Sequence, residues 1–382
     1  MVDFTRESPA TTLFARGATP LLRSLETAAT AGSALASPSY AILDDMGSVD
    51  PTTWTLNTVA GSGGKQLTDA INSLPDKSMF WLPEFLQGET GYPTAGAISS
   101  TYNSQVTGSP YIGELGEDQA WRAMQGMTQL VSQLRTVSGN PNLVMAVDLV
   151  NSNDLAKITQ LFWCELNPTL GFISSGNPFH TKVPDTSVAA NTDHYSVQSN
   201  FDNEMLVCTR ARAWWRAQNN RKPTGAYVGP SYGQFPKITG IVAAAGSNTI
   251  DLTVSLPNGG ALVVPTTPTK GWEVYTGTTS TAIGASGKTY ETGGTPLTVS
   301  SVGLKPGTTD TIRLTLSANL TAGKKTVFYG RITGSGLSSG GGFRGMWTDD
   351  AATSAAAEPL LESCFRANMP LLICPQGITI TV

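Results

Sequence analysis

Residues 117–150 read EDQAWRAMQGMTQLVSQLRTVSGNPNLVMAVDLV, and this stretch indicates a helix followed by a buried strand. Acidic residues open its first part, as is favourable at the amino end of a helix. Apolar residues then recur at helical spacing and predict a helix over residues 117–137. They are Trp121, Met124, Met127, Leu130, Val131 and Leu134. The second part, residues 142–150, is almost continuously apolar, which is typical of a strand covered on both faces.

The same alternation of strands and helices extends to both sides of this stretch. Apolar runs predict strands over residues 79–86 and 170–174, and a helical pattern fills residues 153–166 between strands. Further helical patterns cover residues 18–31, 65–74 and 198–218. Strands and helices in turn predict an α/β fold whose parallel sheet is covered on both faces.

The character of the sequence changes near residue 225. Downstream, short runs rich in Val, Ile and Thr are separated by Gly, Pro, Asn and Ser, and DLTVSL (251–256) and TIRLTL (311–316) alternate cleanly. This pattern predicts an antiparallel β-sandwich. The predicted strands are 238–242, 249–256, 261–264, 271–275, 297–302, 311–316 and 326–330.

These patterns divide the chain into four parts. We expect an N-terminal arm over residues 1–17, the α/β domain over 18–224 and the β-sandwich over 225–335. A C-terminal segment, 336–382, contains a short helical pattern and ends in ITITV. That final run predicts a strand that pairs either with a sheet of its own chain or with a neighbour's.

Composition narrows the classes of function. Charged residues make up only 14% of the 382 residues, against about a quarter in typical soluble domains, and the chain contains 40 glycines. This balance suits a protein packed against other chains. The net charge of −4 and the lack of a long basic run predict no nucleic-acid partner. No apolar run approaches the length of about 18 residues that a membrane span needs, so we expect no membrane insertion.

The N-terminus and the cysteines carry two further expectations. Residues 1–12, MVDFTRESPATT, lack the basic and apolar regions of a signal peptide, which predicts synthesis in a cytoplasm. The four cysteines form no C-x-x-C pair, so we expect buried free thiols, no metal site and no cofactor. They are Cys164, Cys208, Cys364 and Cys374.

Three short segments have the residue types that acyl-transfer chemistry requires. Residues 61–64, GSGG, come directly before a helical pattern, where exposed backbone N–H groups can hold an oxyanion. Residues 87–90, QGET, follow a predicted buried strand. Residues 191–196, NTDHYS, contain one of only two histidines in the chain.

In their order and spacing these segments resemble the sialate O-acetylesterase branch of the SGNH (GDSL) hydrolases, especially versions found in tailed-phage virion proteins. The resemblance covers roughly residues 18–335. It implies a three-layer flavodoxin-like domain followed by a β-sandwich. By this resemblance, Gly63 and Gly64 fall on the oxyanion-hole segment. Gln87, Gly88 and Glu89 match the Q-G-E block, and His194 falls on the histidine of the D-x-x-H block.

The chain departs from the family at two of the three catalytic positions. The family's nucleophile lies in a G-x-S-x block, but the candidate here, Ser8, follows a short charged stretch and precedes Pro9, which has no backbone N–H. Asn191 replaces the aspartate that orients the imidazole and stabilises its charged form. Loss of that carboxylate alone costs about 10⁴-fold in triad enzymes. The catalytic set is therefore degenerate.

The same segments also have ordinary structural interpretations. A glycine run before a helix is often only a tight turn, Glu89 suits a hydrogen-bonded loop carboxylate, and His194 suits a structural hydrogen bond.

Taken together, the sequence favours a non-catalytic virion protein of a phage tail, baseplate or fibre. It would be part of an oligomeric assembly and dock to neighbouring virion proteins or to host-surface polysaccharide. Two alternatives stay open. One is an active O-acetylesterase in which Ser8 attacks and His194 acts as the base. The other is a carbohydrate-binding module that retains the substrate cleft without chemistry.

Overall fold

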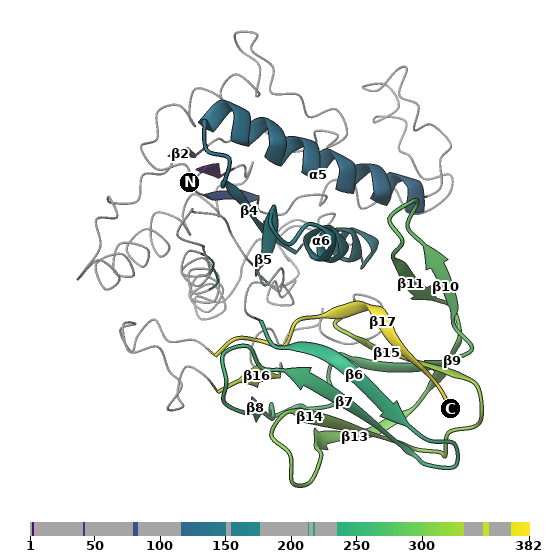
Figure 1. The fold of residues 1–382 in the computed structure, drawn as a ribbon. Helices are drawn as coiled ribbons and strands as arrows, with labels where there is room; N and C mark the ends of the chain where they lie inside the picture. Colours follow the sequence, from purple (N-terminus) through teal and green to yellow (C-terminus); the bar gives the residue numbers. More distant parts are fainter. Residues whose placement is uncertain are drawn as a thin grey trace, which may run out of the picture.

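The computed structural model describes residues 2–3, 41–42, 79–82, 116–149, 154–175, 213, 217, 235–331, 347–350 and 368–382. The two helices and the short parallel strands β3–β5 lie together in one part of the molecule, and the antiparallel strands lie beside them (Figure 1). The two helices of this part of the chain are α5 (Gly116–Ser138) and α6 (Asp154–Leu166). Parallel pairing joins β1 (Val2–Asp3) to β2 (Ala41–Ile42), and joins β3 (Met79–Leu82), β4 (Val144–Asp148) and β5 (Gly171–Ser175) in the order β3-β4-β5.

Helix α5 packs through the apolar stripe that the sequence shows. Met127, Val131 and Leu134 are fully buried, and Gly139, at a φ of 68°, ends the helix with a left-handed residue. Arg135 in the last turn donates hydrogen bonds to the carbonyls of Leu143 and Thr169, at 2.9 and 3.0 Å. These bonds fix the end of α5 to the segments that lead into β4 and β5.

From residue 235 onward, the strands that the structure describes all pair antiparallel. One four-stranded sheet has the order β12-β9-β15-β17 and the other has the order β13-β14-β7-β6, while β10 pairs with β11 and β16 with β8. The bounds are β6 (Lys237–Ala243), β7 (Thr249–Ser255), β8 (Leu262–Val263), β9 (Trp272–Thr276), β10 (Thr279–Ala282), β11 (Thr289–Thr292), β12 (Thr295–Leu297), β13 (Val299–Leu304), β14 (Thr311–Leu316), β15 (Lys324–Tyr329), β16 (Thr348–Asp349) and β17 (Cys374–Thr381).

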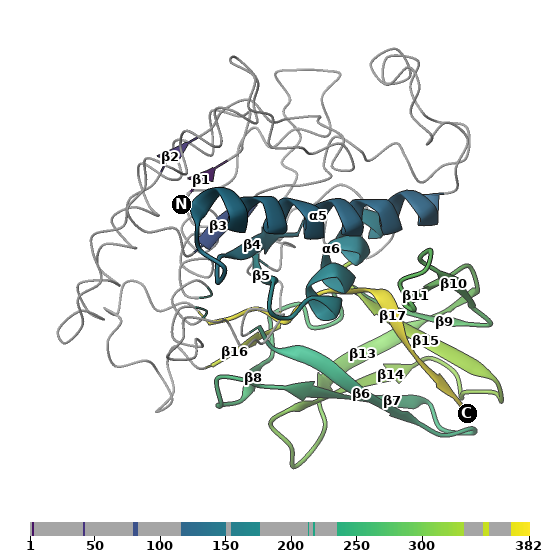
Figure 2. The same ribbon diagram turned by 45° about the horizontal axis from the view of Figure 1, so that its top comes forward.

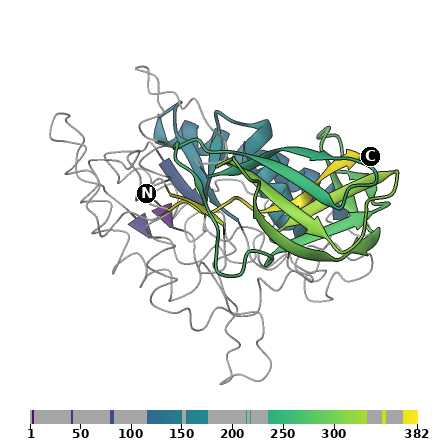
Figure 3. The ribbon, with the colours of Figure 1, turned by 90° about the horizontal axis from the view of Figure 1, so that it is seen from below.

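The two four-stranded sheets enclose one apolar core. Alternate side chains of β7 and β14 point into it, so that Ile250, Leu252, Ile312 and Leu314 are fully buried. The facing sheet contributes Trp272, Val274, Val327 and Tyr329, and the rings of Trp272 and Tyr329 lie 4.3 Å apart. The strands of this sandwich are seen from below in Figure 3.

The sandwich is nearly closed at both of its long sides. On one side β12 runs directly into β13, and the Ser317 amide bonds the Thr298 carbonyl between them at 3.0 Å. On the other side the Leu372 amide, just before β17, donates to the Pro236 carbonyl, just before β6, at 2.8 Å. The final strand, β17, pairs with β15 of the same chain. The sequence alone allowed pairing either within the chain or with a neighbouring chain.

The predicted fold class, an α/β fold with a three-layer flavodoxin-like domain ahead of a β-sandwich, is wrong, because the parallel flavodoxin-like sheet is not found in the described residues. The residues that the structure describes form a β-rich, mostly antiparallel fold with two helices, and their parallel strands are few and short. An apolar run reports that a segment is buried, but it fixes neither the number of strands in its sheet nor their direction. The helical patterns over 18–31 and 65–74, and most of the pattern over 198–218, lie outside the described residues.

The β10–β11 hairpin connects the sandwich to both helices (Figures 1 and 2). At its tip Gly284, with a φ of 46°, lies against the Trp121 side chain of α5, and a Cβ added there would sit 2.5 Å from the Trp121 Cβ. Next to it, Ile283 is fully buried. Lys288, further along the hairpin, lies over the Phe162 ring of α6, with 5.5 Å between its ammonium and the ring centroid.

We expect Gly284→Ala to destabilise the protein by about 1–3 kcal/mol more than Gly287→Ala, because its new methyl group meets the Trp121 side chain. Gly287 is a matched control, since it lies in the same turn, has a φ of 72° and has open space around its Cα. Urea unfolding of both variants measures the difference. Equal losses would show that the hairpin tip does not pack tightly on α5.

Candidate functional site

The residues that the sequence nominates for chemistry lie outside the described residues. This applies to the catalytic candidates Ser8, Asn191 and His194. It applies equally to the proposed oxyanion or ligand-binding residues, Gly63, Gly64, Gln87, Gly88 and Glu89. Their arrangement stays a prediction, and the candidate sites below are built from other residues.

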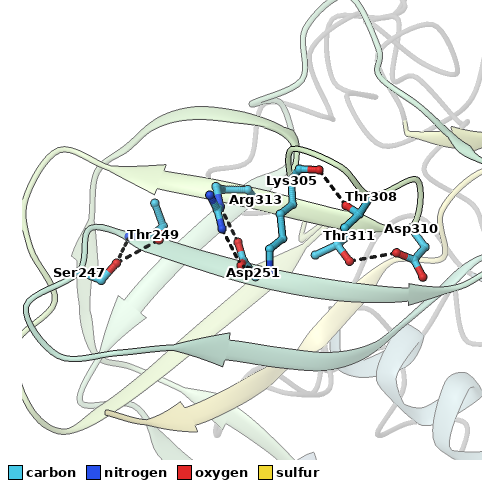
Figure 4. Close-up of polar contacts among 8 residues, drawn as sticks. All are labelled: Ser247, Thr249, Asp251, Lys305, Thr308, Asp310, Thr311 and Arg313. Atoms are coloured by element: carbon cyan, nitrogen blue, oxygen red, sulfur yellow. Dashed lines mark hydrogen bonds and ion pairs between the residues drawn. The ribbon is translucent and has the colours of Figure 1, made fainter.

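The outer face of sheet β13-β14-β7-β6 has a charged group at its centre (Figure 4). Asp251 on β7 and Arg313 on β14 are paired in the register and share this face. The Arg313 guanidinium donates to both carboxylate oxygens of Asp251, at 2.7 and 2.9 Å. Lys305, just after β13, places its ammonium 3.0 Å from Asp251 Oδ2. One carboxylate therefore neutralises one of two neighbouring cations.

Small polar side chains surround this group. Thr253 and Thr249 lie on the same face of β7, and Thr315 is paired with Thr249 on β14. Ser301 of β13 is paired with Thr315, and Val242 of β6 is paired with Asp251. Val242 is 63% exposed. The face therefore has mostly uncharged polar side chains around a charged group at its centre.

Hydroxyl groups also close the turns at the ends of this face (Figure 4). Ser247 Oγ accepts from the Thr249 amide at 3.1 Å, and Thr308 Oγ1 donates to the Lys305 carbonyl at 2.8 Å. Such local bonds favour turns and hold the hairpins in register.

The electrostatics of Asp251 follow from these contacts. Hydrogen bonds from Arg313 lower the pKa of Asp251, and Lys305 adds to this effect, while burial opposes it. The carboxylate is therefore ionised at neutral pH with its charge engaged by the two cations. An engaged carboxylate of this kind stabilises strand pairing and is a poor general base.

A second polar cluster joins helix α6 to the sandwich. Glu165 in the last turn of α6 forms ion pairs with Lys237 of β6 and with Lys288 of the hairpin, the latter at 3.0 Å. Burial by itself raises the pKa of Glu165, but the charges and hydrogen bonds of the two lysines outweigh it and hold the pKa below its usual value. The neighbouring thiol of Cys164 is free and buried, as the sequence predicts, and so is Cys374.

A third cluster fixes the base of the β10–β11 hairpin. Glu291 accepts hydrogen bonds from the hydroxyls of Thr278 and Ser280, both at 2.6 Å, and pairs with Lys324 at 2.6 Å. Burial raises the pKa of Glu291, but these donors, Lys324 first, bring it below the usual value.

The carboxyl ends of β4 and β5 hold a buried pair. Ser174 Oγ donates to Asp148 Oδ1, and Gln160 of α6 donates to the Asp148 carbonyl at 3.0 Å. Both Asp148 and Ser174 are at most 1% exposed, so this pair ties two strand ends together and offers no accessible nucleophile.

Within the ranges described, no group of three His, Cys, Asp or Glu side chains is placed to hold a metal ion. No helix in the same residues is long and apolar enough to cross a membrane.

Sequence reasoning did not identify Asp251, Arg313 or Glu165 as site residues. A signal for the first two was present, because oppositely charged residues occupy polar positions of the two alternating runs DLTVSL and TIRLTL. No comparable signal exists for Glu165, whose partners lie 72 and 123 residues away along the chain.

We compared the chain with family models, curated proteins and solved structures. No protein-family model matches the sequence, and the comparison with curated proteins gives no match either. Among solved structures, the S-layer protein rSbsC(31-844) is similar with 12% identity and a TM-score of 0.20, over 68% of this chain and 30% of that chain. The N-terminal part of the bacterial S-layer protein SbsC is similar with 10% identity and a TM-score of 0.22, over 78% of this chain and 76% of that chain. Similarity this low carries no argument about fold or function.

We expect Glu165→Gln to lower the free energy of unfolding by about 1–3 kcal/mol at pH 7, because two lysines lose their carboxylate in a half-buried interface. The contribution of a carboxylate with a lowered pKa is present above its unfolded value of about 4.3 and is lost as the pH falls through the lower folded value. The difference in free energy of unfolding between wild type and Glu165→Gln should therefore disappear in strong acid.

Denaturant unfolding at pH 7 and pH 3 measures this difference. Asp310→Asn is the control, since the Asp310 carboxylate accepts a hydrogen bond from the Thr311 hydroxyl, at 3.0 Å, on the sandwich surface. Equal stabilities of wild type and Glu165→Gln at pH 7 would contradict the expectation.

Proposed function

We propose that this chain is a non-catalytic structural component of a phage virion, in the tail, the baseplate or a fibre. In this proposal the β-sandwich docks onto a neighbouring virion protein. The observation that carries it is the outer face of sheet β13-β14-β7-β6, which is lined by Thr and Ser and carries a charged group around Asp251. Such a face suits a partner that offers hydrogen-bonding groups over a broad surface.

The attachment of the sandwich to the rest of the chain supports the same role. Glu165 and its two lysines, together with the packing of Gly284 on Trp121, hold the helices and the sandwich together at separate points. A structural protein that binds several neighbours in an assembly benefits when its helices and its sandwich do not move independently. The departures at Ser8 and Asn191 support a role without acyl transfer.

The docking part of the proposal is tested by Thr253→Arg, which places a long cation at an exposed position of the face. Thr295→Arg is the matched control, because Thr295 is an exposed threonine on β12 of the other sheet. In gradient-purified particles assembled with each protein, immunoblotting should detect wild type and Thr295→Arg and much less Thr253→Arg. Thermal melting of both variants checks that they fold.

The non-catalytic part is tested with an acetyl-ester hydrolysis assay on the purified chain. We expect no turnover above the buffer rate, and no difference between wild type and His194→Ala. Turnover that disappears on His194→Ala would overturn the proposal in favour of an O-acetylesterase. Absence of the chain from purified particles would overturn the virion role itself.

A further inference from the structure

Strand β6 is an edge strand, since it lies at the end of its sheet and pairs with β7 only. It runs beside β17, the edge strand of the other sheet (Figures 1 and 2). The hydrogen bond from the Leu372 amide to the Pro236 carbonyl joins the segments just before these strands. Beyond it, no backbone hydrogen bond links β6 to β17 within the described residues. We call this part of the sandwich, between residues 238–244 and 376–382, the open side.

Apolar side chains line the open side and are only partly covered. Ile241 and Ala243 of β6 pack against the core of the sandwich but are half-buried. The same holds for Ile378 of β17 and for Val382, just after it. Val242 points to the outer face of the sheet and is 63% exposed. A further strand laid against β6 would cover these side chains and bond the outward-facing N–H and C=O groups of β6.

The edge of β6 lacks the features that usually keep an exposed strand from pairing with other chains. Proteins protect such edges with charged residues, prolines or bulges. Residues 238–250 contain neither a charged residue nor a proline. A bulge lies between Ile238 and Gly240, but from Gly240 to Ala243 the strand pairs regularly with β7. This regular part of β6 is therefore an uncharged edge that can accept another strand.

The edge of β6 is also complementary to itself. If two β6 strands pair antiparallel about a two-fold axis at Val242, the Val242 side chains of the two copies lie opposite each other. Ile241 of each copy then lies opposite Ala243 of the other, so that a large half-buried side chain meets a small one at both positions. The paired residues, 240–244, contain no charge, and the nearest one, Lys237, lies outside them. No like charges are therefore brought together.

We propose that two copies of this chain associate through β6, by antiparallel pairing of residues 240–244 about a two-fold axis at Val242. The pairing joins the sheets β13-β14-β7-β6 of the two copies into one continuous sheet. Because the contact is made by the same surface of both copies, it closes at a dimer and does not propagate into a fibre. A contact of this length is small, so the association is weak and is favoured where copies are concentrated. It does not depend on the virion role.

Sedimentation equilibrium of the purified chain at about 1–500 µM tests the association. Wild type should dimerise reversibly within this range. Val242→Lys and Val242→Glu each bring like charges together at the axis and remove an apolar contact, so each should weaken dimerisation about 10-fold or more. An equimolar mixture of the two variants should recover a dimer, because opposite charges then meet at the axis.

Val263→Lys is the matched control, because Val263 on β8 is also an exposed valine but lies outside β6. It should dimerise like wild type, and thermal melting of all three variants checks that they fold. A wild type that stays monomeric over the whole range would overturn the proposal. Dimers that persist in both Val242 variants would do the same. If each variant is monomeric and their mixture is too, a two-fold pairing at Val242 is excluded.

Hydrogen exchange of the wild-type protein gives a second test that needs no variant. The outward-facing amides within residues 240–244 should exchange several-fold more slowly at high than at low protein concentration, because pairing protects them. The amides of β13, the opposite edge strand of the same sheet, should show no such dependence. Equal exchange of residues 240–244 at both concentrations would contradict the proposed pairing.

Discussion

Two lysine ammonium groups share the Glu165 carboxylate where α6 meets the sandwich, and the arrangement of the two parts depends on this contact. Burying a carboxylate is costly unless opposite charges compensate it. Here the compensation comes from two separate elements, Lys237 on β6 and Lys288 on the β10–β11 hairpin. One side chain of the helix therefore fixes the positions of both elements. The packing of the hairpin tip on α5 adds a further point of attachment.

Individual elements were easier to predict than the fold they build. The apolar stripe gave the position of α5 to within one residue at each end, since periodicity is a local property of the sequence. Strand β14 lies at the predicted residues, 311–316, because TIRLTL alternates without interruption. The hairpin strands β10 and β11 were missed, because TSTA and TYET contain little apolar alternation. Their position depends on tertiary contacts with the helices, which no local pattern reports.

The candidate sites show the same limit. Oppositely charged residues on two alternating runs could have indicated the pair of Asp251 and Arg313, because cross-strand neighbours follow from register. The cluster around Glu165 could not be read in this way, since it joins residues from three distant parts of the chain. The motifs of residues 61–64, 87–90 and 191–196 belong to a resemblance, and their arrangement in space lies outside the described residues. A resemblance in short motifs also did not guarantee the fold that it implied.

Closure of the sandwich by β17 has a consequence for how the chain is made. Strand β15 leaves the ribosome well before β17, and until β17 arrives the backbone N–H and C=O groups along one side of β15 have no strand to bond. An exposed strand edge invites pairing with other chains. Nascent chains on a crowded polysome would then compete with β17 for the same edge. Slow elongation between these two strands should favour aggregates over correctly folded chains, even though β17 covers this edge of β15 in the finished molecule.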